Sequence, residues 1–469
     1  MKKLLCMMLS LCLLLIAVGC ASADDGIDVS DTKEQEASTV IGKTVVTTEP
    51  LGPSDDPSET AGETKDDPPA TTTTTVMTTT TVEMTTTALA TMAAAEWADA
   101  SKSMTEGGAM TFAATATMPT PGDPLVPEEP EIQVGAGMLT AGEWKDLDDI
   151  PFWTKLLNDN DWYQLLENRG LFANKIVQVK VTDGNGNPCF NVPVVLKDTD
   201  NKEIYKAVTD INGMAYLLYD LDNTKQEAKC VSIGGADYDI VKDGETAIAI
   251  DSATVGVKQL DLLFMIDTTG SMSDELTYLQ AELRDVIRKI AESGAAFAIN
   301  LSVNFYRDTG DEYVVRSFEF TNDIDKAISQ LSEQRTAGGG DYAEAVHLAL
   351  DDVVKNHQWR EDSVKLCFMV LDAPPHTNTE IAGIDERMQT TVMSMAETGI
   401  RFISVASSGV DTETEFLLRS WAVMTGGTYT FLTNHSGIGN SHLEPTIGEY
   451  EVEKLNDLLV RVISEYCGL

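Results

Sequence analysis

The feature that most constrains the fold of this 469-residue chain is an apolar run that stops abruptly at a polar cluster. Residues 262–266 are all apolar, as in a strand buried on both faces, and such strands belong to parallel sheets covered by helices. The run ends in Asp267, Thr269 and Ser271. Because open α/β sheets bind ligands at the carboxyl ends of their strands, these three side chains are candidates for a binding site.

The last two hundred residues alternate between strand-like and helix-like segments. The segment after the polar cluster, 274–294, carries leucine, valine and isoleucine at helical spacing, and apolar strand patterns return at 297–306, 364–372, 400–407 and 428–432. This rhythm predicts a doubly wound α/β domain over residues 258–468, with one short antiparallel edge strand at 312–320. The loops after its parallel strands would meet at one edge.

Four segments in order resemble the von Willebrand factor type A domain. The run "DTTGS" matches that family's DxSxS pattern, and "TAGGGDYAEAV" and "VLDAPPH" match the other two loops of its metal-ion-dependent adhesion site. The segment "YRDTGDEY" resembles the subgroup found in hemicentin and in alpha-type protein kinases. The resemblance implies a cell-adhesion type of domain that holds Mg²⁺, or Mn²⁺ or Ca²⁺, through Asp267, Thr269, Ser271, Asp341 and Asp372.

These residue types suit a hard divalent ion. Mg²⁺ prefers six oxygen ligands, which short hydroxyls and carboxylates at strand ends can supply while one position stays open. The resemblance implies that this position accepts a carboxylate from an extracellular partner protein. One departure from the family pattern concerns its second loop, where "GGG" leads into Asp341 while the threonine, Thr336, lies five residues earlier. An aspartate there would hold the ion more firmly and make it a weaker acceptor for a partner's carboxylate.

Other functions for these residues stay open. One alternative is that "DTTGS" merely turns the chain and that Asp274 with its neighbours starts the helix. Another is a structural scaffold whose metal site only braces the loops. A haloacid-dehalogenase-like phosphatase also ends a buried strand with an aspartate, but its second acid is replaced here by Thr269, and no GxSxG motif is present. We therefore expect no enzymatic activity. Three loop histidines, His376, His435 and His442, could bind zinc if they converged.

The first residues resemble the signal of a bacterial lipoprotein. Two lysines, a short apolar stretch and "AVGC" form a charged region, a hydrophobic region and a small-residue cleavage site over residues 1–19. Cys20 would then be lipidated, for example with palmitate, and become the mature N-terminus. This predicts a protein on the extracytoplasmic face of the cell membrane, held there by its lipid alone.

Residues 20–138 are acidic and threonine-rich, a composition that buries too little apolar surface to fold, so we expect a disordered stalk. Residues 139–173 are rich in aromatic side chains. This density of aromatic residues predicts that the segment is a structural brace packed on a neighbouring domain. Residues 174–255 alternate with period two between glycine and asparagine turns. That segment predicts a small all-β sandwich and resembles immunoglobulin-like and carboxypeptidase-regulatory-like modules.

Charge and cysteines limit the function further. The formal net charge of −42 argues against nucleic acid as a partner, because binding of phosphate backbones needs a basic patch. Cys189 and Cys230 fall within the predicted sandwich and could pair, whereas Cys367 lies in an apolar strand pattern and is expected to be a buried small hydrophobic residue.

Overall fold

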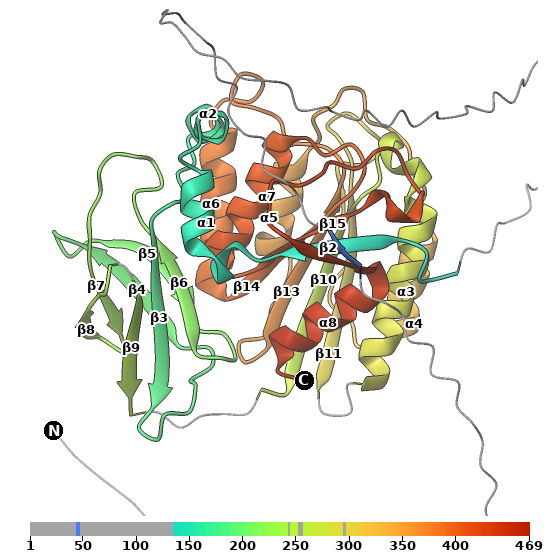
Figure 1. The fold of residues 1–469 in the computed structure, drawn as a ribbon. Helices are drawn as coiled ribbons and strands as arrows, with labels where there is room; N and C mark the ends of the chain where they lie inside the picture. The colour runs from blue at the N-terminus through green and yellow to red at the C-terminus, as the bar shows by residue number, and fades with distance from the viewer. Residues whose placement is uncertain (1–43, 47–134, 243, 252–256, 294–296) are drawn as a thin grey trace, which may run out of the picture.

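The computed structural model describes residues 135–242, 244–251, 257–293 and 297–469, and the backbone of one short strand, Thr44–Val46 (Figure 1). The predicted signal peptide, Cys20 and nearly all of the predicted stalk lie outside these residues. The strand Thr44–Val46 (β1) falls within the stalk, where no regular structure was expected. Among the described residues, no helix is both long and apolar enough to cross a membrane.

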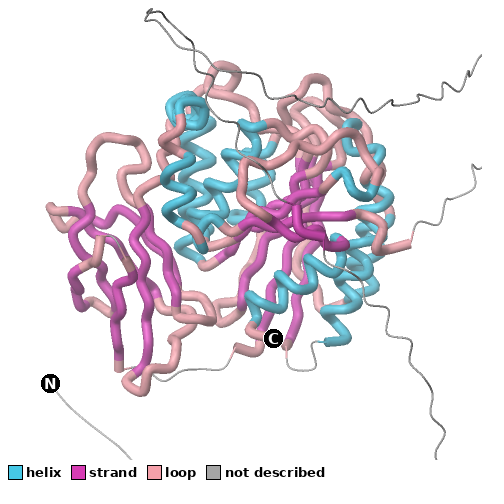
Figure 2. Tube along the Cα trace, viewed as in Figure 1, coloured by secondary structure: helices cyan, strands magenta, loops and turns pink. Residues whose placement is uncertain are grey.

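The largest unit is a nine-stranded mixed sheet with helices on both faces (Figure 2). Its order is β1-β16-β2-β15-β14-β13-β10-β11-β12, where β2 is Thr140–Trp144, and the five strands from β15 to β11 run parallel to one another. The predicted doubly wound α/β head is therefore confirmed. Its strands are β10 (Gln259–Asp267), β11 (Ala298–Tyr306), β12 (Val315–Arg316), β13 (Val364–Leu371), β14 (Ile400–Ala406), β15 (Thr428–Leu432) and β16 (Tyr450–Lys454).

Alternate residues of the central strands enter two separate cores. Phe264 of β10 packs in one core, where its ring stacks on Phe368 at 5.3 Å, and Met265 points into the other. The first core is covered by α3 (Leu276–Ser293), α4 (Ile324–Ser332) and α8 (Leu455–Cys467), and the second by α5 (Val346–Lys355), α6 (Ile384–Thr398) and α7 (Thr412–Thr425). Burial on both faces explains why these strands are apolar without alternation.

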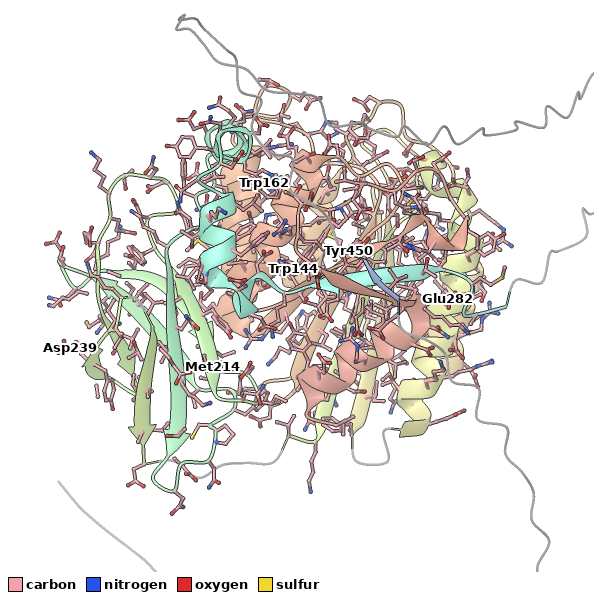
Figure 3. The ribbon with its side chains drawn as sticks, in the orientation of Figure 1. Trp144, Trp162, Met214, Asp239, Glu282 and Tyr450 are labelled. Carbon is pink, nitrogen blue, oxygen red and sulfur yellow. The ribbon has the colours of Figure 1, made fainter. Side chains whose placement is uncertain are left out.

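The aromatic-rich segment joins the head directly. Its first part is a strand, β2 (Thr140–Trp144), between β15 and β16, and it continues through η1 (Asp146–Asp148), α1 (Ile150–Leu156) and α2 (Asn160–Arg169). Glu282 of α3, fully buried, accepts hydrogen bonds from the backbone N–H groups of residues 137–139 at 2.7, 2.8 and 3.0 Å (Figure 3). These bonds fix the point where the described chain enters the head.

Residues 176–250 form two small sheets beside the head, with orders β6-β3-β9 and β5-β4-β7-β8. They dock on α6, α7 and the start of β14. Tyr205 donates to the carbonyl of Met424 in α7 at 2.7 Å, and Arg401 of β14 donates to that of Val208 at 2.9 Å. The likeness to an immunoglobulin-like module stays a prediction. The strands are β3 (Ile176–Asp183), β4 (Pro193–Asp198), β5 (Glu203–Val208), β6 (Met214–Leu218), β7 (Ala228–Ile233), β8 (Ala236–Asp239) and β9 (Glu245–Ile250).

The four described cysteines are buried thiols without a disulfide. Cys189 and Cys230, left open as a possible pair, are therefore separate. Cys367 is fully buried in β13, as its apolar surroundings indicated.

Candidate metal centre

The sheet brings two of the proposed acids to the same edge. The parallel strands β10 and β13 are neighbours, with Ile266 opposite Val370. Asp267 is the last residue of β10, and Asp372 follows the last residue of β13. Both side chains are almost completely buried. Two carboxylates from distant parts of the sequence thus lie at adjacent strand ends.

The turn after β10 is organised around Asp267. Its Oδ1 accepts hydrogen bonds from the backbone N–H of Thr269 at 2.8 Å and from the Thr269 hydroxyl at 2.7 Å. The hydroxyl oxygens of Thr269 and Ser271 are 3.1 Å apart. Two ligands of one octahedral Mg²⁺ lie about 3.0 Å apart, since each is about 2.1 Å from the ion. The two hydroxyls are hydrogen-bonded to each other, and their spacing is also compatible with a shared ion.

The glycine run of the second loop closes over this turn. The backbone N–H of Ala337 donates to the carbonyl of Thr268, and that of Gly270 donates to the carbonyl of Gly338, both at 3.1 Å. Gly338 has a φ of +80°, and a Cβ there would lie 2.2 Å from a carboxylate oxygen of Asp311. A residue with a Cβ would be strained in this backbone conformation, so the position requires glycine. From here the chain continues to a further acid, Glu344.

Glu344 completes a set of three acids from three loops. It is 2% exposed, and its backbone N–H donates to the carbonyl of Pro374 in the third loop at 2.9 Å. One oxygen of each acid is buried without a hydrogen-bond partner: Oδ2 of Asp267, Oε2 of Glu344 and Oδ1 of Asp372. Unpaired buried carboxylates are costly, and a cation would compensate them.

The acids oppose one another's ionisation. Burial raises the pKa of Asp267 to about 6. Burial, followed by the charge of Asp267, raises the pKa of Asp372 to about 7. Burial and the charges of Asp267, Asp308 and Asp372 raise the pKa of Glu344 to about 9. At the carboxyl edge of the sheet, the negative charges of these three acids are thus not fully neutralised by other groups of the protein.

The three carboxylates are nevertheless not a compact ligand set. Among the described residues, the one group of three or more acid, histidine or cysteine side chains whose ligand atoms all lie within 4.8 Å of one another is Asp341, His376 and Glu380. An ion at the strand ends would thus take Thr269 and Ser271 as direct ligands and reach some of the acids through water. The donor set fits a hard cation held in this way.

A buried arginine supports the loops from behind. Arg307 donates from Nε to the carbonyl of Thr268 at 3.1 Å and from a terminal nitrogen to that of Arg335 at 2.7 Å. Its guanidinium also stacks on the ring of Tyr313, 4.4 Å from the centroid. These contacts join the loops after β10 and β11 to the start of the glycine run. They explain the place of "YRDTGDEY" beside the candidate site.

The structure places the predicted site residues in two groups. Asp267, Thr269, Ser271 and Asp372 share the strand-end site, whereas Asp341 is exposed and lies with His376 and Glu380. The acid that the second loop brings to the strand ends is Glu344, which is not among the predicted site residues. The available signal was its position in "DYAEAV", directly before the apolar residues that open α5.

The three loop histidines do not share a site. His435 is exposed, the Nε2 of His442 lies 3.0 Å from Glu275, and the Nε2 of His376 lies 2.9 Å from Asp308. The zinc site considered for these three residues is thus not formed. Of the three, His376 is the one that lies in a cluster of ligand-type side chains, with Asp341 and Glu380.

Fold and site together define a doubly wound α/β domain with a candidate cation site at the carboxyl edge of its sheet. Residues 261–434 match the family model of the von Willebrand factor A domain. The match lies within the head, over the segments whose motifs resemble that family.

Two curated proteins each match over 120 residues, which is 25% of this chain. One is a putative ariadne-like RING finger protein of Acanthamoeba polyphaga mimivirus, 32% identical, and the other is the alpha-protein kinase vwkA of Dictyostelium discoideum, 27% identical. The matched stretch covers only 11% and 19% of their lengths.

Among solved structures, the chain is similar to a crystal structure of the conserved hypothetical protein BatB from Bacteroides thetaiotaomicron. The sequence identity is 11% and the TM-score is 0.31, over 45% of this chain and 100% of that one.

Proposed function

We propose that the head binds a partner protein through a divalent cation held at the carboxyl edge of the sheet. The observation that carries this proposal is the set of three buried carboxylate oxygens without partners, one from each of three loops, next to a hydroxyl pair at 3.1 Å. A von Willebrand factor A domain in this part of the chain favours protein interaction as its role.

The cation would be Mg²⁺, with Mn²⁺ or Ca²⁺ as substitutes, since the donors are oxygens. Thr269 and Ser271 would bind it directly, and Asp267, Asp372 and Glu344 would neutralise its charge. When bound, the ion supplies an electrophilic position for a carboxylate of the partner. The protein's own residues hold the hydroxyls in place: Asp267 fixes Thr269, and Arg307 fixes the loop around Thr268.

We further propose that the protein acts at the cell surface without catalysis. In this proposal Cys20 is lipidated, the stalk carries the head away from the membrane, and an extracellular protein is the partner. The formal net charge of −42 supports a protein rather than nucleic acid as that partner.

The test is a pull-down of surface and matrix proteins on the immobilised chain, with Mg²⁺ or with a chelator. We expect a partner to bind with Mg²⁺ and to be lost both with the chelator and in Asp267→Asn. Asp239→Asn is the matched control, because Asp239 is an exposed acid of β8 far from the head (Figure 3).

Thermal unfolding of the same samples distinguishes partner binding from a purely structural role of the cation. At 100 times its dissociation constant, Mg²⁺ would stabilise the native head by about 2.7 kcal/mol. Stabilisation by Mg²⁺ without any chelator-sensitive partner would identify a structural scaffold. Turnover of a phosphomonoester that requires Asp267 would contradict the proposal in favour of a phosphatase.

A further inference from the structure

A second cluster of ligand-type side chains lies outside the strand-end site. It consists of Asp341, from the loop before α5, and His376 and Glu380, from the loop after β13. One ligand atom of each lies within 4.8 Å of the other two. Asp341 and Glu380 are exposed, so the cluster opens to solvent.

His376 has one ring nitrogen committed and the other free. The side chain is 10% exposed, and its Nε2 lies 2.9 Å from Oδ1 of Asp308. Because a carboxylate only accepts hydrogen bonds, Nε2 carries the proton and donates. Nδ1 is buried and has no hydrogen-bond partner. In the neutral ring its lone pair is thus directed at the cluster.

Glu380 is positioned in advance by its own turn. Its Oε2 accepts hydrogen bonds from the backbone N–H of Thr377 at 2.7 Å and from the Thr377 hydroxyl at 2.9 Å. Its Oε1 lies 3.6 Å from Nδ1 of His376, which is too long for a hydrogen bond. Two ligands of one tetrahedral Zn²⁺ lie about 3.4 Å apart, since each is about 2.1 Å from the metal.

We propose that Asp341, Nδ1 of His376 and Glu380 form a second cation site, specific for a transition metal such as Zn²⁺. An imidazole nitrogen favours Zn²⁺ over Mg²⁺, and the remaining position is open to water or to a group of a partner. Asp308 would act as the carboxylate that orients a metal-binding histidine from behind. The proposal does not depend on the function of the strand-end site.

The competing arrangement is an imidazolium without a metal. Burial lowers the pKa of His376, but the hydrogen bonds and negative charges of Asp308 and Glu380 together outweigh burial, and the net shift is upward. A protonated His376 would then bridge Asp308 and Glu380 as an ion pair. Zinc binding and this ion pair exclude each other, because both use Nδ1.

Calorimetry distinguishes the zinc site from the ion pair of His376. Zn²⁺ is titrated into the tag-free chain while Mg²⁺ saturates the strand-end site. We expect one Zn²⁺ per chain, and a Kd at least 100-fold weaker in His376→Asn. Glu380→Gln should weaken it about 10-fold, and because Glu380 is exposed this variant keeps its fold. Asp308→Asn should weaken binding about 10-fold to 100-fold through the orientation of the ring.

Matched controls are His435→Asn and Glu386→Gln, which remove an exposed histidine and an exposed acid outside the cluster. Both should bind Zn²⁺ as the unaltered chain does. Absence of Zn²⁺ binding in the unaltered chain would overturn the proposal. It would also be overturned if binding disappeared in Asp267→Asn and persisted in His376→Asn, since the metal would then occupy the strand-end site.

Discussion

At the scale of single residues, the strand-end acids lie in surroundings that favour their protonated forms. Asp267, Asp372 and Glu344 have pKa values of about 6, 7 and 9, all above the ordinary range of carboxyl groups. A carboxyl with a raised folded-state pKa binds protons more strongly in the native than in the unfolded chain. Its effect on stability therefore depends on pH in a predictable direction.

The chelated protein should lose stability as the pH rises from 5 to 8. In this window the native chain holds more protons than the unfolded chain, so the free energy of unfolding falls with pH. Mg²⁺ binds the ionised acids, so the stabilisation that it adds should grow over the same window. Melting temperatures across this range check both trends, and Glu344→Gln should show a shallower fall than the unaltered chain. A chelated protein whose melting temperature rises with pH would contradict the assignment.

Glu344→Gln should also change the affinity for the cation. Removing one negative charge should weaken Mg²⁺ binding about 10-fold, while the ion becomes a better acceptor for a partner's carboxylate. Calorimetry with Mg²⁺ measures the first effect, and an acidic peptide added to the Mg²⁺-loaded chain measures the second. Asp341→Asn and Thr336→Ala are the comparisons. If one of these two substitutions lowers the Mg²⁺ affinity while Glu344→Gln does not, the second loop contributes Asp341 or Thr336, and not Glu344, to the cation site.

The sequence was enough to predict where four of the residues lie: Asp267 and Asp372 stand at the ends of apolar strands, and Thr269 and Ser271 are in the turn after Asp267. Their position at the sheet edge follows from the parallel topology alone. Glu344 could not be found in this way. Its approach depends on positive-φ glycines that carry the chain back across Thr269, and spacing along the sequence does not encode that path.

At the scale of elements, the segment before the small sheets is anchored by a buried ion pair. Arg419 of α7 is fully buried and bonds both oxygens of Asp146 at 2.6 and 2.9 Å and Glu415 at 2.9 Å. Its guanidinium also lies 5.2 Å from the ring of Trp153 and 5.1 Å from that of Trp162. One side chain thus joins η1, α1 and α2 to the head.

Arg419→Met should therefore destabilise the head by about 3–5 kcal/mol, since it leaves two buried carboxylates without their partner. Urea unfolding gives the difference in the free energy of unfolding. Arg288→Met is the matched control, because Arg288 is exposed on α3 and should change stability by less than about 0.5 kcal/mol. If Arg419→Met and the unaltered chain have the same free energy of unfolding, the ion pair makes no net contribution to stability.

Some elements depend on partners that the sequence does not reveal. Residues 451–466 have a helical pattern throughout, yet Tyr450–Lys454 forms the strand β16, since β2 offers it an edge to pair with. The edge strand expected at 312–320 is reduced to Val315–Arg316, which pairs antiparallel with β11. Strand pairing of this kind is decided by tertiary contacts rather than by local preference.

At the scale of the whole molecule, the head and the two small sheets share one continuous core. Residues from both sheets, from α1 and α2, and from α5, α6 and α7 belong to the same hydrophobic cluster. Figure 1 shows the small sheets beside α6 rather than separated from it by a linker. The described part of the chain is therefore one packed body.

The proposed membrane anchor is tested at this scale as well. Cys20→Ser should release the chain into the medium or leave its signal unprocessed, because no lipid could then be attached. Cell fractionation followed by mass spectrometry of the N-terminus measures both outcomes. A substituted chain that is still processed and still bound to membranes would contradict lipid anchoring.

The entry of the chain into the head has a mechanical consequence. The backbone of residues 137–139 is held by Glu282, and the next residues form β2, an interior strand paired on both sides. A pull on the preceding chain would act along this strand, so its hydrogen bonds would be loaded in shear and would share the force. Ala141 pairs with Leu432, the last residue of β15, so β2 begins at the carboxyl edge where the partner is proposed to bind, and the sheet itself would link the two points of load.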